Sequence, residues 1–189
     1  MNLNFSDEQN LLRDSVSRFC TSDYDFETRM KSVNSDSGFS KEHWKLFADL
    51  GWLAVPFDEE LGGLGGDVLD LSILFEEFGK SIVVEPYLAN VVLAGGVLKR
   101  SGFDKKDEYL SSIVSGEKQF SLANYEPEKG YNLENIETVL DDKGLLSGSK
   151  STVLNAPNAD YFIVFSKKGD DFCFSCLLYT SPSPRDLST

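Results

Sequence analysis

Cysteine, histidine and basic residues are scarce in this chain of 189 residues. It has three cysteines and one histidine, and its 18 Lys and Arg residues stand against 31 Asp and Glu residues, which gives a net charge of −13. Three cysteines at irregular spacing indicate neither a disulfide framework nor a metal site. An acidic surface repels phosphate backbones, so the composition disfavours nucleic acid as a partner.

Long apolar runs are also absent. No stretch approaches the roughly 20 apolar residues that cross a bilayer, and the first residues lack the basic start and apolar stretch of a secretory signal. The shares of hydrophobic and charged residues, 41% and 26%, are ordinary for a globular protein. We therefore expect a cytoplasmic protein of one or two domains without a membrane span.

The first part of the chain has the apolar spacing and the capping residues that are typical of helices. Ser6 and Gln9 form a capping box, Ser40 is a good N-cap, and Asp104 is the expected cap of a last helix. Apolar residues recur at helical spacing behind these caps. The pattern predicts helices that start after residue 6 and that cover 26–33, 40–51, 68–79, 86–99 and 104–116.

The apolar period changes to alternation near Lys118, as is typical of strands. Strands are expected over 119–127, 136–140, 145–147, 152–154, 161–165 and 172–174. A run of helices followed by a run of strands predicts an α+β protein. We expect an all-α helical bundle in residues 1–117 and a truncated antiparallel β-domain in residues 118–175.

Residues 50–66, LGWLAVPFDEELGGLGG, join two of the expected helices. Gly51 can adopt the left-handed conformation that ends a helix, and the four later glycines let a ligand or another backbone approach closely. Alone, these glycines are explained as well by a tight connector as by a ligand loop. In this order, however, the segment resembles the N-terminal helical domain of the acyl-CoA dehydrogenases.

Two segments in the strand region resemble the middle domain of the same family. NYEPEKGYN keeps Glu126, Pro127 and Gly130 of the family's TEPxAGSD motif. GSKSTVLNAPNAD keeps the family's Gly148, Lys150, Asn155, Ala156, Ala159 and Asp160. The resemblance covers about residues 4–175. It implies FAD as cofactor, with flavin contacts at Asn124, Tyr125, Gly130, Thr152, Val153 and Leu154.

Packing of a β-core is the alternative explanation for these flavin positions. Tyr125 and Leu154 also depart from the hydroxyl residues that are usual in the family. Backbone contacts to a flavin would survive both changes, whereas a hydroxyl contact from Leu154 would not.

The resemblance also implies a substrate and a reaction. The family helix that corresponds to residues 86–99 lines the acyl tunnel, so Tyr87, Val91 and Gly95 are expected to face an acyl-CoA, with core packing as the alternative. In the family, a glutamate removes the α-proton of the thioester while a hydride leaves the β-carbon for the flavin. That glutamate belongs to a C-terminal domain downstream of these residues, so no catalytic residue is assigned.

The chain offers few other groups for acid–base chemistry. Carboxylates on its helices and turns include Glu59, Glu60, Glu76, Glu77 and Glu85. We expect these carboxylates to be solvated. The single histidine, His43, is expected to lie at the surface rather than to act in catalysis.

One branch of the family, that of the pimeloyl-CoA dehydrogenase small subunit, is resembled more narrowly. The resemblance lies in the divergent motif NYEPEKGYN and in the segments YDFETRM and VVEPYLANVVLAGGVL. This implies a hetero-oligomer with a more typical acyl-CoA dehydrogenase subunit. Electron-transferring flavoprotein is the acceptor implied, with direct use of oxygen as the alternative. Two functions stay open: a flavin-dependent dehydrogenase subunit that is inactive as a fragment, or a non-catalytic structural subunit. A general α+β binding module is a third reading.

The last residues, 176–189, break with the pattern before them. CLLYTSPSPRD resembles a translated sequencing adapter. A natural disordered C-terminus is the alternative. We expect this tail to be disordered and the native protein to continue beyond Ser175.

Overall fold

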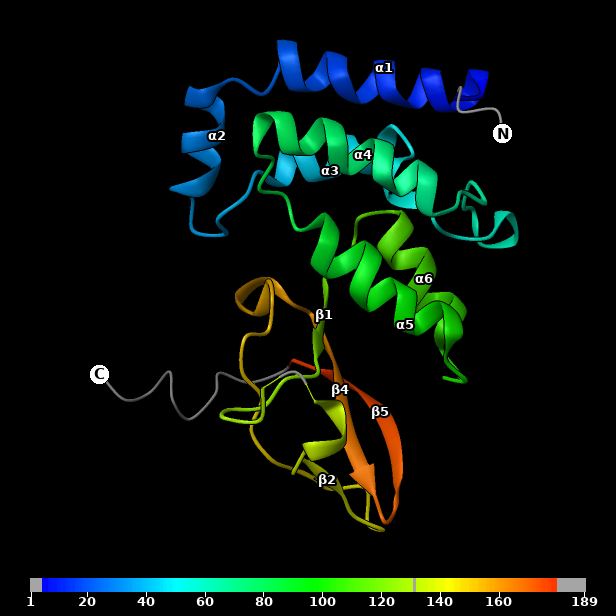
Figure 1. Ribbon diagram of the computed structural model, residues 1–189, viewed down its shortest axis with the longest axis vertical. Helices are drawn as coiled ribbons and strands as arrows, with labels where there is room; N and C mark the ends of the chain where they lie inside the picture. Colours follow the sequence, from blue (N-terminus) through cyan, green and yellow to red (C-terminus); the bar gives the residue numbers. More distant parts are fainter. Residues whose placement is uncertain (1–4, 131, 180–189) are drawn as a thin grey trace.

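The chain folds into a bundle of helices that is followed by a small sheet (Figure 1). The computed structural model describes residues 5–130 and 132–179. The helices of the bundle are α1 (Asp7–Ser22), α2 (Phe26–Val33), α3 (Lys41–Asp49), α4 (Val68–Ser81), the π-helix η3 (Leu88–Ala94), α5 (Gly95–Arg100) and α6 (Lys106–Val114). Short 3₁₀ helices are η1 (Trp52–Ala54), η2 (Glu59–Leu61), η4 (Leu133–Asn135) and η5 (Ala156–Asn158). The order of helices and then strands confirms the predicted α+β class.

Two of the three predicted helix caps are confirmed. The Ser6 hydroxyl accepts from the Gln9 backbone N–H at 3.2 Å and the Gln9 side chain accepts from the Ser6 backbone at 3.0 Å, which closes the capping box of α1. The Ser40 hydroxyl accepts from a backbone N–H of α3. The prediction for Asp104 is wrong, because α6 begins one residue too late and its cap position holds Lys105.

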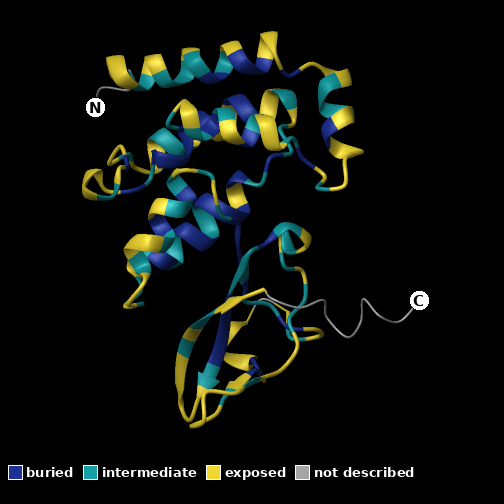
Figure 2. Cartoon of the chain, turned by 180° about the vertical axis from the view of Figure 1, so that it is seen from behind, coloured by how far each residue is buried: buried dark blue, intermediate teal, exposed yellow. Residues whose placement is uncertain are grey.

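Aromatic rings fill the centre of the bundle, where the buried residues concentrate (Figure 2). The ring of Trp52 lies 4.9 Å from that of Phe47 and 5.9 Å from that of Phe78, and Phe47 and Phe78 stack at 5.3 Å. Each such ring contributes roughly 1.5–3 kcal/mol through its burial. The two buried residues of α3, Trp44 and Phe47, therefore point into the core of the bundle.

The glycine segment packs its backbone against the chain that precedes it. Backbone N–H groups of Leu64, Gly65 and Gly66 donate to the carbonyls of Ala54, Phe57 and Val55 at 3.0, 2.8 and 2.8 Å. A β-carbon on Gly63 would lie 2.0 Å from the Phe57 carbonyl oxygen and one on Gly66 would lie 2.7 Å from the Val55 carbonyl oxygen, so no side chain fits at these two positions. The structure thus supports the tight-connector explanation of these glycines.

The sheet is mixed, and β4 lies at its centre. Its strands are β1 (Phe120–Ala123), β2 (Val139–Leu140), β3 (Leu146–Ser147), β4 (Tyr161–Lys168) and β5 (Asp171–Leu178). β5 pairs with β4 as an antiparallel hairpin, whereas β1 and β2 both run parallel to β4. The predicted sheet was antiparallel throughout, and that detail is wrong. The chain returns to β4 through a long connection after β1 and not through a hairpin, which is how parallel neighbours arise.

The strand predicted over 152–154 does not form. Thr152 has φ 53° and Asn155 has φ 58°, both in the left-handed region. An extended strand cannot contain such residues. The segment instead makes a turn that leads into η5.

The disorder predicted from Cys176 onward is wrong for residues 176–179. Cys176 pairs with Ile163 of β4, and the two residues after it continue the same ladder. The backbone N–H of Tyr179 donates to the Asp160 carbonyl at 2.8 Å. Backbone hydrogen bonds to the central strand thus hold the start of the segment that resembles an adapter. The rest of that prediction concerns residues 180–189, which lie outside the described part of the chain.

Among the helices in the described ranges, none is long and apolar enough to cross a membrane.

Two helical glycines should respond to alanine with opposite signs. A β-carbon on Gly79 of α4 would meet nothing within 4 Å, whereas one on Gly95 would lie 2.6 Å from the ring of Phe57. We expect Gly79→Ala to raise the free energy of unfolding by about 1 kcal/mol through helix propensity. Gly95→Ala should lower it by about 1–3 kcal/mol through overpacking. Urea unfolding measures both, and a stabilising Gly95→Ala would contradict the close contact with Phe57.

Candidate functional site

The two segments that carry the strand-region motifs lie side by side. The backbone N–H of Ser151 donates to the carbonyl of Tyr125 at 2.9 Å. This bond places Thr152 next to the end of β1, where Asn124 and Tyr125 are half-buried. The structure therefore brings these three predicted flavin contacts into one region.

A buried ion pair holds the two segments together. The Glu126 carboxylate is 6% exposed, and it accepts from the Lys150 amino group at 2.8 Å and from the backbone N–H groups of Glu137 and Thr138 at 2.6 and 2.9 Å. Burial alone would raise the pKa of Glu126, but these hydrogen bonds and one from the Thr138 hydroxyl outweigh it and lower the pKa to about 2. Two residues kept from the family motifs thus have a structural role.

Gly148 has a packing reason as well. A β-carbon there would lie 2.4 Å from the hydroxyl oxygen of Thr138, which itself donates to Glu126. The backbone of the second segment therefore passes directly over the group that fixes the first.

The turn at 152–154 presents an exposed apolar side chain beside this junction. Leu154 is 46% exposed, Thr152 is exposed and Val153 is half-buried. A left-handed β-branched residue such as Thr152 is uncommon and often marks a functional turn. Gly130 lies in an exposed turn with φ 63°. Its predicted flavin contact stays a prediction.

Amide side chains tie this turn to the helical bundle. Asn155 donates to the Gln119 side-chain oxygen at 3.1 Å, and Asn158 donates to the Ser37 carbonyl at 2.9 Å. The Asp160 carboxylate accepts from the Gln119 backbone N–H at 2.8 Å. The turn is therefore held at a set place between the bundle and the sheet.

A hollow of about 380 Å³ separates the turn from the bundle. Leu154 and Asn155 border it on one side, and Leu88 and Ala89 of η3 border it on the other. Leu88 is 44% exposed, which is unusual for a large apolar side chain on the central helix of the bundle. It was not among the predicted site residues.

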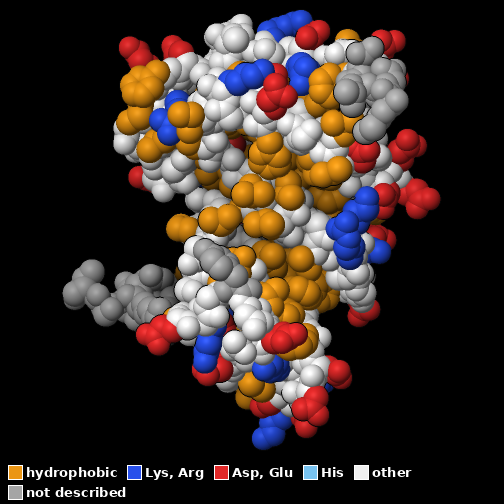
Figure 3. All heavy atoms as spheres, in the orientation of Figure 1, with side chains coloured by type: hydrophobic (Ala, Val, Ile, Leu, Met, Phe, Trp, Pro, Cys, Tyr) orange, Lys and Arg blue, Asp and Glu red, His pale blue; other side chains and the backbone are white. Residues whose placement is uncertain are grey.

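A second, more apolar groove of about 410 Å³ runs between the helices and the sheet. Its apolar lining consists of Val92, Leu93, Gly96, Val97, Leu122 and Phe174. Figure 3 shows apolar side chains gathered in a band across this junction of helices and sheet. An elongated apolar ligand in this groove would have η3 and α5 on one side and the sheet on the other.

The residues predicted to face an acyl group are buried in the bundle. Tyr87 is 1% exposed and donates its hydroxyl to the Trp52 carbonyl at 2.8 Å, and burial raises the pKa of that phenol. Val91 is fully buried and Gly95 packs against Phe57. The substrate-facing role of Tyr87, Val91 and Gly95 stays a prediction, and these contacts are those of core packing.

The helical side of the groove includes η3, which is a π-helix. In η3 the hydrogen bonds span five residues, so its side chains do not follow the α-helical period. Val92 and Gly96 line the groove, next in the chain to the predicted Val91 and Gly95.

Two carboxylates that were expected in solvent are buried. Glu85 accepts from the Tyr24 hydroxyl at 2.9 Å and lies 3.2 Å from the Nδ1 atom of His43. Glu77 is 2% exposed and pairs with the Lys80 amino group at 2.6 Å. The expectation of solvation is therefore wrong for these two carboxylates, since polar partners within the protein replace water.

Comparisons with known proteins bear on this arrangement. Residues 6–117 match the family described as "Acyl-CoA dehydrogenase, N-terminal domain". The chain belongs to the acyl-CoA dehydrogenase family. It is 30% identical over 169 residues to the caffeyl-CoA reductase-Etf complex subunit CarC of Acetobacterium woodii, which covers 86% of this chain and 44% of that protein. It is 28% identical over 172 residues to the short-chain specific acyl-CoA dehydrogenase of Clostridium acetobutylicum, which covers 88% of this chain and 45% of that protein.

Solved structures of this family share the fold. An FAD complex of PigA superposes with a TM-score of 0.82 at 26% identity, and the ChsE4-ChsE5 complex from Mycobacterium tuberculosis superposes with 0.84 at 25% identity. Each match covers 96% of this chain and 50% of the other. The chain thus spans about half the length of the relatives it matches. The narrower resemblance to pimeloyl-CoA dehydrogenase stays a prediction.

Proposed function

We propose that this chain is the flavin-side part of a subunit of a flavin-dependent acyl-CoA dehydrogenase. The reaction is the α,β-dehydrogenation of an acyl-CoA thioester, with FAD as the hydride acceptor. The observation that carries the proposal is the bond from Ser151 to Tyr125, because it joins the two motif segments at one edge of the sheet. Family membership supplies the chemistry that this edge would serve.

The residues at this edge suit a flat ring with a polar rim. Leu154 and Val153 would support the ring face, and backbone groups at Asn124 and Tyr125 would meet its polar edge. Fixed backbone dipoles stabilise charge on a bound ring without rearrangement. The buried pair of Glu126 and Lys150 keeps both loops in register for this task. Among the described residues we assign no catalytic base.

The acyl group is proposed to lie along the apolar groove between the helices and the sheet. Val92 and Gly96 come from the helical side, and Leu122 and Phe174 come from the sheet. Leu88 lies nearer the flavin edge, on the hollow that Leu154 also borders. The substrate would thus run from the flavin edge along η3 and α5.

We propose a partner acyl-CoA dehydrogenase subunit and an electron-transferring flavoprotein as partners. Two similar proteins support this by their names: one is part of a reductase-Etf complex, and one is a ChsE4-ChsE5 complex. A non-catalytic structural subunit is the second candidate. It is favoured by Leu154, which stands where the family usually has a hydroxyl.

The proposal predicts that a charge on the turn weakens FAD binding. We expect Leu154→Asp to raise the dissociation constant of FAD at least tenfold, because a carboxylate there would have to lose its hydration against the face of the ring. Quenching of flavin fluorescence on titration measures the constant. Leu145→Asp is the matched control, since Leu145 is 62% exposed on the connection between β2 and β3. Equal affinity of the two variants would contradict the flavin site.

A second measurement separates the two candidate functions. A yellow complex with the partner subunit that bleaches on addition of an acyl-CoA supports a dehydrogenase subunit. A colourless chain that raises the activity of a flavin-containing partner supports the structural subunit.

A further inference from the structure

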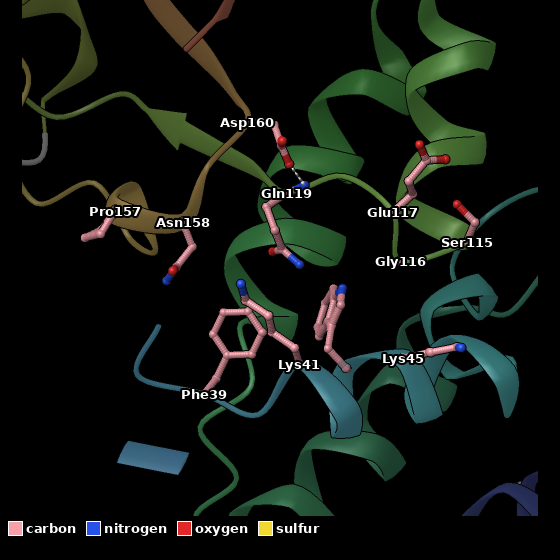
Figure 4. Close-up of a pocket in the computed structure, with 11 residues that line it drawn as sticks. Phe39, Lys41, Lys45, Ser115, Gly116, Glu117, Gln119, Pro157, Asn158 and Asp160 are labelled. Atoms are coloured by element: carbon pink, nitrogen blue, oxygen red, sulfur yellow. Dashed lines mark hydrogen bonds between the residues drawn. The ribbon is translucent and has the colours of Figure 1, made fainter. Parts of the chain in front are cut away.

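A larger pocket, of about 610 Å³, lies at the junction of the bundle and the sheet and is distinct from the proposed flavin edge. It shares Phe39, Pro157 and Asn158 with the hollow beside Leu88, so these residues form the wall between the two. The remaining lining comes from α3, from the connection between α6 and β1, and from the end of the 157–160 turn (Figure 4).

An unmet hydrogen-bond donor points into this pocket. Gln119 is 8% exposed, and its side-chain oxygen already accepts from Asn155. Its Nε2 group makes no hydrogen bond with the part of the chain that the structure describes. Figure 4 shows this amide directed toward Phe39 and Lys41. Among the described residues that line this pocket, the indole Nε1 of Trp44 is the side-chain donor that is buried without a partner. A buried donor that lacks a partner costs about 1–3 kcal/mol, so a ligand acceptor there would be favourable.

The charged side chains that line the pocket are Lys41, Lys45, Glu117 and Asp160. Lys41 and Lys45 line it from successive turns of α3, and neither forms an ion pair with another described residue. The Asp160 carboxylate is already compensated by the Gln119 backbone N–H and by Lys118 at 3.4 Å. Figure 4 shows the Glu117 carboxylate on the side of α6, directed away from Lys41, so an anion would be favoured only at the end of the pocket beside Lys41 and Gln119.

The remaining walls are apolar and partly aromatic. The rings of Phe39 and Trp44 lie 6.3 Å apart in an edge-to-face arrangement, and Pro157 faces the pocket from the turn. Aromatic rings in this arrangement accept a further ring by stacking or by edge contact.

We propose that this pocket binds a small arylcarboxylate. The carboxylate would accept from Lys41 Nζ and Gln119 Nε2, and the aryl ring would pack against Phe39 and Trp44. The inference goes beyond the proposed dehydrogenase function and uses none of the flavin or acyl residues. A ligand here would bridge the helical bundle and the turn that carries Leu154.

Benzoate is the probe, and isothermal titration calorimetry of the purified chain measures its binding. We expect Gln119→Glu to weaken benzoate binding at least tenfold. The new carboxylate keeps an acceptor for Asn155 but repels the ligand and replaces the donor. Lys41→Gln should weaken binding severalfold through loss of the cation. Benzamide, which has the same ring without the charge, should bind at least tenfold more weakly than benzoate.

Gln9→Glu is the matched control, because it makes the same charge change in α1 and keeps a good capping residue, although it loses the hydrogen bond from Gln9 to Asp70. It should leave benzoate affinity unchanged. Circular dichroism melting checks that each variant folds. If Gln119→Glu does not fold, the exposed-site variant Lys41→Gln serves as the deciding test. No measurable benzoate binding by the wild type overturns the proposal. So does equal binding of benzamide, or an equal loss in Gln9→Glu.

Discussion

Glu126→Ala is expected to lower the free energy of unfolding by about 3–5 kcal/mol, the range for breaking a buried ion pair from one side. The substitution leaves the Lys150 amino group, whose side chain is 10% exposed, without its counter-charge. It also leaves two backbone N–H groups without an acceptor. Because this carboxylate joins the two motif segments, the sheet edge should lose its order first. Urea unfolding followed by circular dichroism measures the change.

Glu137→Ala is the matched control for that experiment. Glu137 also pairs with a lysine, Lys129, but its side chain is 75% exposed. Exposed pairs contribute less than about 1 kcal/mol, so this variant should unfold near the wild-type urea concentration. Equal losses in the two variants would show that the buried network does not hold the sheet edge.

Acid provides an independent readout of the same group. Glu126 has a pKa of about 2 in the folded chain against an ordinary value of 4.5. Its contribution to stability is therefore complete above pH 4.5 and is lost as the pH falls toward 2. We expect wild-type stability to fall more steeply across this window than that of Glu126→Gln.

Gly63→Ala is expected to lower the free energy of unfolding by about 3 kcal/mol. A β-carbon at this position would lie 2.0 Å from the carbonyl oxygen of Phe57 and 2.2 Å from its carbonyl carbon. These are backbone atoms, which cannot move aside as the end of a flexible side chain can. Relief would require moving Phe57, which is 1% exposed and whose ring occupies the space above Gly95.

Gly102→Ala is the control for the glycine experiment, since a β-carbon there would meet nothing within 4 Å. Thermal unfolding should place this control within a few degrees of the wild type and Gly63→Ala well below it. A melting temperature of Gly63→Ala equal to that of the control would mean that the glycine segment is not packed as tightly as the structure shows.

Local features of the fold were predictable because short-range physics sets them. The helix at 26–33 was predicted at its observed bounds, and the Ser6 and Ser40 caps act on backbone groups within three residues. Such signals need no knowledge of the rest of the chain. The Asp104 error shows their limit, since a shift of one residue removes a cap.

The candidate site was only partly predictable. The resemblance of the motif segments identified the loops, and the bond from Ser151 to Tyr125 confirms that they meet. The burial of Glu85, and the contact of the fully buried Asn90 with the Phe120 backbone at 2.9 Å, had no local signal. Both depend on partners that lie 30 or more residues away along the chain.

The amino-acid sequence by itself determined the helices, their caps, the position of the change from helix to strand and the loops that carry the family motifs. Each of these follows from residues within a few positions of one another. Tertiary structure alone decided which strands run parallel, which face of η3 lines the groove and which carboxylates are buried. Those outcomes depend on the free energy of contacts between distant segments, which no local pattern contains.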